Sequence, residues 1–434
     1  MPDTVLSRFL RYVQIDTESD AASPTSPSTA AQWDLLRLLE QELRDLGAQE
    51  VVLTEHGYVM ATLPATSDRA GVPTIAFLGH VDTTADFTGQ NVKPLVHREW
   101  NGKPIVLPDD PDRVLDPAVI AELARAKGKD IVTASGRTLL GADDKAGVAE
   151  VMTLAAYLLA HPEIRHGTVR VCFTPDEEIG RGVDHLDLDQ LGAQAAYTLD
   201  GENPGEVVWE TFSADQAVVT LEGIATHPGE AKKQGMLNAV HLAGKLLAAL
   251  PREFSAPETT EGRQGYLHPS RIEGSVERTT IMFILRDHEL PGLEEKGRRL
   301  LGLCQGLQAA EPRARIRCEI RPQYRNMGYW LKKDMTPVDL AYDAMRAVGL
   351  EPASPATRGG TDGSRLTERG LPTPNLFCGG HNAHGPLEWV AVQDMELAVR
   401  ACVELVQVWE QKGAGYKGYR PKGRRPKKSQ PAHG

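Results

Sequence analysis

Four short apolar segments, spread along the chain, each end in small, acidic or histidine residues. They are "TIAFLGHVD" from Thr74, "TVRVCFTPDEEIG" from Thr168, "AAYTLDGE" from Ala195 and "TPNLFCGGHNAHG" from Thr373. Stretches with helical periodicity lie between them, such as "DKAGVAEVMTLAAYLLAH". Strands that alternate with helices predict an α/β domain with a mostly parallel sheet. Ligands of such sheets bind at the carboxyl ends of the strands, which is where these polar residues lie.

The middle of the chain has a different pattern. "DQAVVTLEG" alternates like a half-exposed strand, and the helical stretch "LNAVHLAGKLLAALP" follows it. Two strand-like runs in "GSVERTTIMFILRDH", a helix in "GLEEKGRRLLGLCQGL" and a strand in "RIRCEIRP" complete the order β-α-β-β-α-β. This order predicts an inserted α+β domain of the split βαβ, ferredoxin-like kind. We expect a discontinuous first domain at 1–212 and 323–411, an inserted domain at 213–322, and a basic tail at 412–434.

The bulk composition fits a soluble globular protein. The chain has 434 residues, of which 41% are hydrophobic and 25% are charged, and a chain of this length favours two domains. No apolar run reaches the roughly 18 residues that a membrane-spanning helix needs. The first residues, "MPDTVLSRFLRYVQID", resemble an amphipathic helix and not a signal peptide. We therefore expect a cytoplasmic protein with no membrane partner.

The distribution of cysteines and of charge further limits the kind of protein this chain can be. The five cysteines are scattered and form no C-x-x-C pair, which favours reduced thiols over a disulfide framework or a thiolate zinc site. The net charge is −11, yet the last 23 residues hold eight Lys or Arg and no acid, so the rest of the chain is strongly acidic. An acidic body does not favour nucleic-acid binding. The Gly- and Pro-rich tail is expected to be disordered and to have no specific partner.

His80 and Asp82 lie two residues apart at the end of the first apolar segment. Side chains at i and i+2 of a strand point to the same face, so the imidazole and the carboxylate can touch. One use of such a pair is a metal-bound histidine whose other ring nitrogen is held by a carboxylate. The other use is a simple hydrogen-bonded pair. These two residues alone leave both interpretations open.

The other segments also present acids or histidines at their ends. The aspartates of "LLGADDKAGVAE" could cap the helix that follows, although a cap needs only one of them. "TPDEEIG" is either a surface turn or the source of a metal ligand and a neighbouring general base. Asp200 ends a third strand in "TLDGE", and "HNAHGPLEW" offers two histidines. Four strand ends that each offer His, Asp or Glu fit a hydrolytic site with two metal ions.

The charges of such a set would balance. Two divalent cations held by two neutral imidazoles and three carboxylates, one of them shared, need one hydroxide to reach neutrality. Water between two such ions loses its proton near neutral pH and becomes a nucleophile. A carboxylate outside the cluster can accept that proton.

A set of segments that runs in consistent order over roughly residues 1–410 resembles the co-catalytic di-zinc metallopeptidases. The set comprises "GHVDTT", "LLGADDKAG", "FTPDEEIGRG", "TLDGE", "THPG", "RGGTDG" and "NAHG". Three of them, "GADDKAG", "TPDEE" and "RGGTDG", are closer to the tripeptide aminopeptidases than to the dipeptidases or deacylases of the same superfamily. The resemblance implies that the first domain is catalytic and that the inserted domain is a lid.

The resemblance implies two Zn²⁺ sites that share one carboxylate, held by His80, Asp143, Asp200, Glu178 and His384. One ion would take His80 and Asp200, the other Glu178 and His384, and Asp143 would bridge them together with a water or hydroxide. His384 is preferred over His381 because it matches the histidine of the family's asparagine–x–histidine–glycine stretch.

The same resemblance implies roles outside the ligand set. Glu177 would be the general base, and Asp82 would orient the imidazole of His80. His227 in "ATHPGEAK" is similar to the family's oxyanion-stabilising histidine, although a histidine at a helix start can also have no such role. Arg286 and Arg358 are similar to substrate-carboxylate binders, because a guanidinium can hold a carboxylate with two hydrogen bonds. The alternative for each arginine is a structural ion pair.

The activity implied is therefore that of a di-zinc aminopeptidase that releases the N-terminal residue from tripeptides, with a small peptide as substrate. A related dipeptidase or N-acyl amino acid deacylase is the first alternative, and an inactive relative that binds peptide or metal is the second. The basic tail and the Pro- and Ser-rich loop at 20–29 depart from the family's pattern. Neither touches a motif, and they leave the oligomeric state open, a homodimer included.

Overall fold

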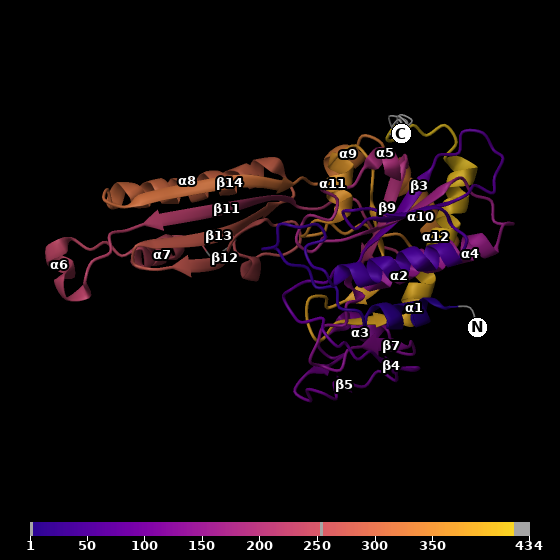
Figure 1. Ribbon diagram of the computed structural model, residues 1–434, viewed down its shortest axis with the longest axis horizontal. Coiled ribbons are helices and arrows are strands. Elements are labelled where there is room, and N and C mark those ends of the chain that lie inside the picture. Colours follow the sequence, from indigo (N-terminus) through magenta and orange to yellow (C-terminus); the bar gives the residue numbers. More distant parts are fainter. Residues whose placement is uncertain (1–2, 252–254, 421–434) are drawn as a thin grey trace, which may run out of the picture. The chain divides into compact units, whose positions relative to one another are not determined.

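The computed structural model describes residues 3–251 and 255–420, which form two compact units. Unit 2 consists of Glu210–Tyr329 and Ala356–Gly360, and the remaining described residues form unit 1. Each unit has its own main sheet (Figure 1). Each also has its own hydrophobic core. Residues 421–434 of the predicted basic tail lie outside the described residues.

Unit 1 is built on a seven-stranded sheet in the order β1-β2-β8-β3-β9-β15-β10. In that order the strands are Gln49–Leu53, Val59–Leu63, Val169–Thr174, Ile75–His80, Ala195–Gly201, Asn375–Phe377 and Val207–Val208. The central strands β8, β3, β9 and β15 are parallel, while β1, β2 and β10 pair antiparallel at the edges. The predicted α/β domain with a mostly parallel central sheet is confirmed.

Both faces of this sheet are buried, because successive residues of its strands enter different cores. In β3, Ile75 and Phe77 join one core cluster, whereas Ala76 and Leu78 join another. The first cluster is covered by α1 (Val5–Tyr12), α2 (Gln32–Asp45), α4 (Ala142–Ala160), α10 (Thr336–Ala347) and α12 (Val392–Lys412). The second is covered by α5 (Leu188–Leu191) and α11 (Asp362–Glu368). Helices on both faces explain why these strands are continuous apolar runs.

Smaller elements complete unit 1. A second sheet has the order β16-β17-β7-β4, and β5 pairs with β6. These elements and the short helix α3 are Gly380–His381, Trp389–Ala391, Ile131–Thr133, Leu95–His97, Ile105–Val106, Val114–Leu115 and Ala121–Arg125. After α12 the chain continues along unit 1: the Tyr416 ring packs on Trp409, and the Tyr419 hydroxyl donates to Asp189. No helix in the described ranges is long and apolar enough to cross a bilayer.

Unit 2 is a four-stranded antiparallel sheet in the order β12-β13-β11-β14, with two helices on one face. In chain order its elements are β11 (Ser213–Glu222), η1 (Pro228–Glu230), α6 (Ala231–Gln234), α7 (Ala239–Ala248), η2 (Pro257–Thr259), β12 (Tyr266–Gly274), β13 (Arg278–Asp287), α8 (Leu290–Ala310) and β14 (Arg315–Tyr324). Its core includes Val219, Phe283 and Leu300. The long elements follow the predicted order β-α-β-β-α-β, which confirms the split βαβ architecture. The short helix α9 (Gly328–Leu331) lies where the chain passes back to unit 1.

Candidate metal centre

The carboxyl ends of the parallel strands of unit 1 bring the five predicted metal ligands together. His80 is the last residue of β3, and Asp200 lies one residue before the end of β9. Glu178 follows β8, Asp143 lies in the first turn of α4, and His384 follows β16. Because parallel strands end at one edge of the sheet, segments far apart in the sequence meet here.

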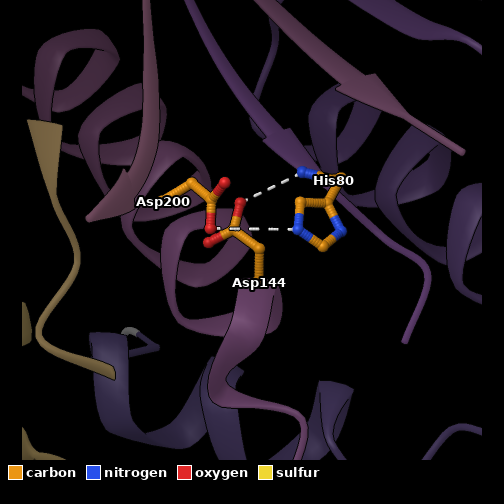
Figure 2. Close-up of side chains that lie close together, drawn as sticks. All are labelled: His80, Asp144 and Asp200. Carbon is orange, nitrogen blue, oxygen red and sulfur yellow. Dashed lines mark hydrogen bonds and ion pairs between the residues drawn. The ribbon is translucent and has the colours of Figure 1, made fainter. Parts of the chain in front are cut away.

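The imidazole of His80 lies between acidic groups on both sides. Its Nε2 atom is 3.0 Å from Oδ1 of Asp143 and 3.9 Å from Oδ1 of Asp200, the second contact being drawn in Figure 2. Its Nδ1 atom is 3.1 Å from the backbone oxygen of Asp82 and 3.4 Å from Oδ1 of the same residue. The ring therefore has one nitrogen free for the acidic cluster and the other held by Asp82.

His384 makes a matching set of contacts. Its Nε2 atom is 3.0 Å from Oε2 of Glu178 and 3.5 Å from Oδ2 of Asp143, and its Nδ1 atom is 3.2 Å from Oδ2 of Asp86. Asp143 thus faces one imidazole with Oδ1 and the other with Oδ2. This is the arrangement that a carboxylate shared by two metal ions requires.

The spacing of these atoms fits metal coordination. Bonds of about 2.0–2.1 Å at tetrahedral angles put neighbouring ligand atoms roughly 3.3 Å apart, and the four nitrogen–oxygen separations in the cluster range from 3.0 to 3.9 Å. Oε1 of Glu178 is buried and has no hydrogen-bond partner within the described part of the chain. A buried carboxylate oxygen without a donor is costly unless a cation faces it. The donor set therefore fits a pair of divalent cations.

The electrostatics of the cluster support the same conclusion. Burial raises the pKa of Glu178 to about 7, and the negative charge of Asp143 adds to the effect. Burial also raises the pKa of Asp200 well above its usual range. Hydrogen bonds with Asp143 and Glu178 raise the pKa of His384 to about 11. Burial opposes a charge on His80, but the carboxylates of Asp143 and Asp82 still raise its pKa. The site concentrates negative charge and stabilises positive charge.

Asp143 and Asp144 point in different directions because the start of α4 is not helical. Their backbone angles are φ −83°, ψ 104° and φ −119°, ψ 34°. Asp144 is fully buried; its Oδ2 accepts the backbone N–H of His80 at 3.1 Å and its Oδ1 accepts that of Gly147 at 3.2 Å. His80, Asp144 and Asp200 are close enough to share an ion (Figure 2). Both oxygens of Asp144 already accept backbone N–H groups, however, whereas the oxygens of Asp143 face the two imidazoles.

Asp82 and Glu388 hold the loops that carry the cluster. Asp82 is fully buried and accepts the backbone N–H of Glu177 at 2.9 Å and of Glu178 at 3.2 Å. Glu388 is also buried and accepts three backbone N–H groups, including that of Asp143 at 2.9 Å. The sequence interpretation missed Glu388, although a lone acid in the apolar run "PLEWVAV" was a signal for it.

Glu177, the predicted base, is the sequence neighbour of Glu178, the predicted metal ligand. Burial raises the pKa of its carboxyl well above the usual range, and the charges of Asp362 and Asp200 raise it further. A carboxyl group in this state can hold a proton near neutral pH. Asp86 is a second residue that the sequence interpretation missed, because nothing in "TTADF" distinguishes an exposed aspartate that contacts His384 from a solvated one.

The three predicted substrate-binding residues, His227, Arg286 and Arg358, lie in unit 2. Arg286 stacks over Tyr324 and donates to the backbone oxygens of Asp215 and Leu285. Arg358 stacks over Phe212 and Tyr266 and donates to Oγ1 of Thr260 at 2.8 Å. Arg286 and Tyr266 are register partners on neighbouring strands, so the two arginines share one end of the sheet.

His227 lies away from these arginines. It follows the end of β11, whereas Arg286 pairs with Ala214 at the start of that strand. Ten residues of extended strand separate these ends by roughly 30 Å. His227 is exposed, and its Nδ1 atom accepts the backbone N–H of Gly229 at 3.2 Å as the cap of η1. Within unit 2 the structure therefore brings the two arginines together and leaves His227 apart from them.

Comparison with known proteins identifies relatives along nearly the whole chain. The family model "Peptidase family M20/M25/M40" matches residues 139–408. The chain is 46% identical to a peptidase T of Geobacillus thermodenitrificans over 412 residues, which cover 95% of this chain and all of the relative. It is also 46% identical over 412 residues to a peptidase T of Brevibacillus brevis, with the same coverage.

Solved structures share the fold. The aminopeptidase PepT of Bacillus cereus superposes with a TM-score of 0.69 at 23% identity, covering 93% of this chain and 98% of that one. The YxeP protein of Bacillus subtilis, a dinuclear metal-binding peptidase, superposes with a TM-score of 0.61 at 13% identity, covering 93% and 97%. At these identities the superpositions bear on the fold alone.

Proposed function

The chain belongs to peptidase family M20/M25/M40 and is a peptidase, and from this membership we propose that it is a di-zinc aminopeptidase that releases the N-terminal residue from tripeptides. The observation that carries the proposal is the position of Asp143, whose two oxygens face His80 and His384 separately. Relatives that are 46% identical over nearly the full chain carry the name peptidase T, which supports the same activity.

The metal ligands in this proposal are His80, Asp143, Asp200, Glu178 and His384. Two Zn²⁺ ions bound there would polarise the scissile carbonyl and lower the pKa of a water molecule toward neutrality. Zinc suits the mixed imidazole and carboxylate set, although the same set would also bind manganese or cobalt.

The protein's own residues then handle the proton and the peptide. Glu177 accepts the proton of the attacking water and passes it to the nitrogen of the departing amine. Asp82 holds Nδ1 of His80, so that Nε2 keeps its direction toward the cluster. Arg286 and Arg358 bind the carboxylate of the peptide. His227 lies at the other end of β11, roughly 30 Å from Arg286, which is farther than a tripeptide spans, so it is not assigned to the same peptide.

We place the enzyme in the cytoplasm, acting on small peptides. All five of its cysteines are free thiols, four of them buried, which is a state that a reducing compartment maintains. The strongly acidic body argues for a small-molecule substrate over a polyanionic one.

The test is a panel of trialanine, dialanine, tetra-alanine and N-acetyl-trialanine, with release of free alanine followed by chromatography. We expect alanine from trialanine only, with loss of release on chelation and recovery on adding Zn²⁺. Alanine from dialanine would replace the proposal by a dipeptidase, and acetate with free trialanine from the acetylated peptide would replace it by a deacylase, provided that trialanine itself gives no alanine. Protein that binds two metal ions and acts on none of these would be the inactive relative.

A further inference from the structure

Asp176, the first acid of "TPDEEIG", lies next to Glu177 but takes no part in the cluster. It is 1% exposed, and its φ angle is +59°. This left-handed backbone is uncommon for residues other than glycine, and it costs of order 1 kcal/mol or more unless the surroundings hold it. Asp176 is therefore held in place by something outside its own turn.

The holding contacts come from a segment almost 150 positions earlier in the chain. The backbone N–H of Ser28 donates to both carboxylate oxygens of Asp176, at 3.0 and 2.8 Å, and the Ser28 hydroxyl donates to Oδ1. Nε2 of Gln32 donates to Oδ1 at 2.8 Å, while Oε1 of Gln32 accepts the backbone N–H of Asp176 at 3.3 Å. All three residues are buried. We call Ser28, Gln32 and Asp176 the rear clamp.

The same early segment also contacts the other end of the turn. Arg181 donates through its guanidinium to the backbone oxygens of Ser23 at 2.8 Å and Asp20 at 3.0 Å. The backbone N–H of Arg181 donates in turn to the backbone oxygen of Asp176 at 2.9 Å. The Pro- and Ser-rich loop at 20–29, which the family resemblance leaves unexplained, is thus attached to both ends of the turn that carries Glu177.

The carboxylate of Glu177 has no hydrogen-bond partner among the described residues, so its direction depends on its backbone. That backbone is fixed on one side by Asp82, which accepts the Glu177 N–H, and on the other by the rear clamp. We propose that Ser28, Gln32 and Asp176 are positioning residues that aim the Glu177 carboxylate at the attacking water. This inference rests on the proposed role of Glu177. A misplacement of about 1 Å can cost about a hundredfold in rate.

Two substitutions remove the side-chain hydrogen bonds of the clamp, leave the two from the Ser28 backbone N–H, and do not change the turn itself. Ser28→Ala removes the hydroxyl donor, and Gln32→Met keeps the length of the side chain without its hydrogen bonds. For the double variant we expect kcat on trialanine to fall about 10- to 100-fold, with KM within about twofold of wild type and unchanged bound metal. Ser23→Ala and Gln41→Met are matched controls, since the Ser23 hydroxyl contacts only Thr25 among the described residues and Gln41 is exposed. Both controls should keep the wild-type kcat.

A second readout does not depend on turnover. Amide hydrogen exchange at Glu177 and Glu178 should be at least about tenfold faster in the double variant than in the controls, because the turn loses the side-chain hydrogen bonds of the rear clamp. Ser28→Thr retains a hydroxyl and should restore most of the protection and of kcat. Unchanged exchange and a kcat within twofold of wild type would overturn the proposal. So would a loss of kcat that follows loss of metal, because the clamp would then serve the ligand Glu178.

The variant Asp176→Gly distinguishes the effect of the clamp's hydrogen bonds from the effect of the strained backbone at position 176. Glycine adopts a positive φ without cost, so it would preserve or improve activity if Asp176 served only to tolerate that conformation. The clamp proposal expects the opposite, a loss of kcat as large as in the double variant. A wild-type enzyme with no aminopeptidase activity would refute the proposed function itself, whereas an active wild type with an equally active Asp176→Gly would refute the clamp alone.

Discussion

Asp82 accepts the backbone N–H of Glu177 at 2.9 Å, so one buried carboxylate connects the predicted base to the predicted ligand His80, whose Nδ1 atom lies 3.4 Å away. Asp82→Ala should therefore damage metal binding and turnover together. Loss of the carboxylate that orients a ligating histidine typically weakens metal affinity about 10- to 100-fold. Competition with a graded chelator, read by metal analysis after dialysis, measures the change. Metal affinity equal to wild type would contradict the role of Asp82.

Asp86 provides a matched comparison, because it contacts Nδ1 of His384 at 3.2 Å with a side chain that is 74% exposed. An exposed ion pair contributes about 0–1 kcal/mol, much less than a buried hydrogen-bonded one. Asp86→Ala should thus weaken metal binding less than about fivefold in the same chelator assay. Equal losses in the two variants would show that burial does not decide the strength of these carboxylate–histidine contacts.

Glu177 and Glu178 are neighbours in the sequence with different expected roles, and isosteric amides separate them. Glu177→Gln should retain both metal ions and lose about 10²- to 10⁴-fold in kcat, which is the usual contribution of a general base. Glu178→Gln should lose metal first, since its Oε2 atom is the partner of His384 at 3.0 Å. Metal analysis and turnover on the same samples give both results. Loss of metal from Glu177→Gln would exchange the two assignments.

The fold was predictable because the periodicity of apolar residues can be read directly from the sequence, whereas contacts between distant residues cannot. The strand that ends at His80 is buried on both faces, so all of its residues before that end are apolar or small. The sequence alone therefore showed where this strand lies and where it ends. The ligand candidates were visible for the same reason, as acids and histidines placed where such runs end.

Asp82 was predicted to orient His80, but the supporting contacts of Glu388 and Asp176 were not, because their partners lie far away in the chain. Glu388 binds backbone N–H groups about 250 positions earlier, and Asp176 binds Ser28 at a separation of 148. The sequence around Glu388 and around Asp176 does not indicate which distant residues they contact. The distance between His227 and Arg286 in unit 2 could not be predicted either. The motif "ATHPGEAK" resembles that of a substrate-binding histidine, but it does not show that the length of β11 separates this histidine from Arg286.

His381 should make the protein sensitive to mild acid. Its imidazole is buried and stacked on Trp389 at a centroid distance of 4.3 Å, and it faces Glu122, Arg125 and Lys129. Burial lowers its pKa from 6.5 to about 4. The folded state therefore excludes a proton that the unfolded state accepts, so stability is complete above about pH 6.5 and falls as the pH drops toward 4, by up to about 3 kcal/mol. His381→Phe keeps the stacking and should flatten this decline in urea unfolding.

The control for that measurement is His241→Phe, because His241 is an exposed histidine of unit 2. It should leave the acid decline unchanged. A decline of the same slope in His381→Phe would assign the acid sensitivity to other groups, among them the buried His166, whose pKa is also lowered by burial.

Glu150 in α4 should reduce stability as the pH rises. It is fully buried, and neither carboxyl oxygen has a hydrogen-bond partner in the described part of the chain. Burial raises its pKa well above 4.5, and the charges of Asp144 and Asp394 add to the effect. Above about pH 4.5, folding then requires the Glu150 carboxylate to take up a proton. The contribution of Glu150 to the free energy of unfolding is therefore complete below about pH 4.5 and is lost as the pH rises toward its folded-state pKa.

Glu150→Gln has no proton to take up and should be the more stable form at neutral pH. Its advantage should grow as the pH rises above 4.5 and should level off at the folded-state pKa of Glu150. Urea unfolding at pH 5, 6 and 7, with chelator present so that metal binding does not contribute, measures the slope. Glu396→Gln, at an exposed position of α12, is the control and should show none. If Glu150→Gln were less stable than wild type at pH 7, the buried carboxylate would have to be charged and to face a cation.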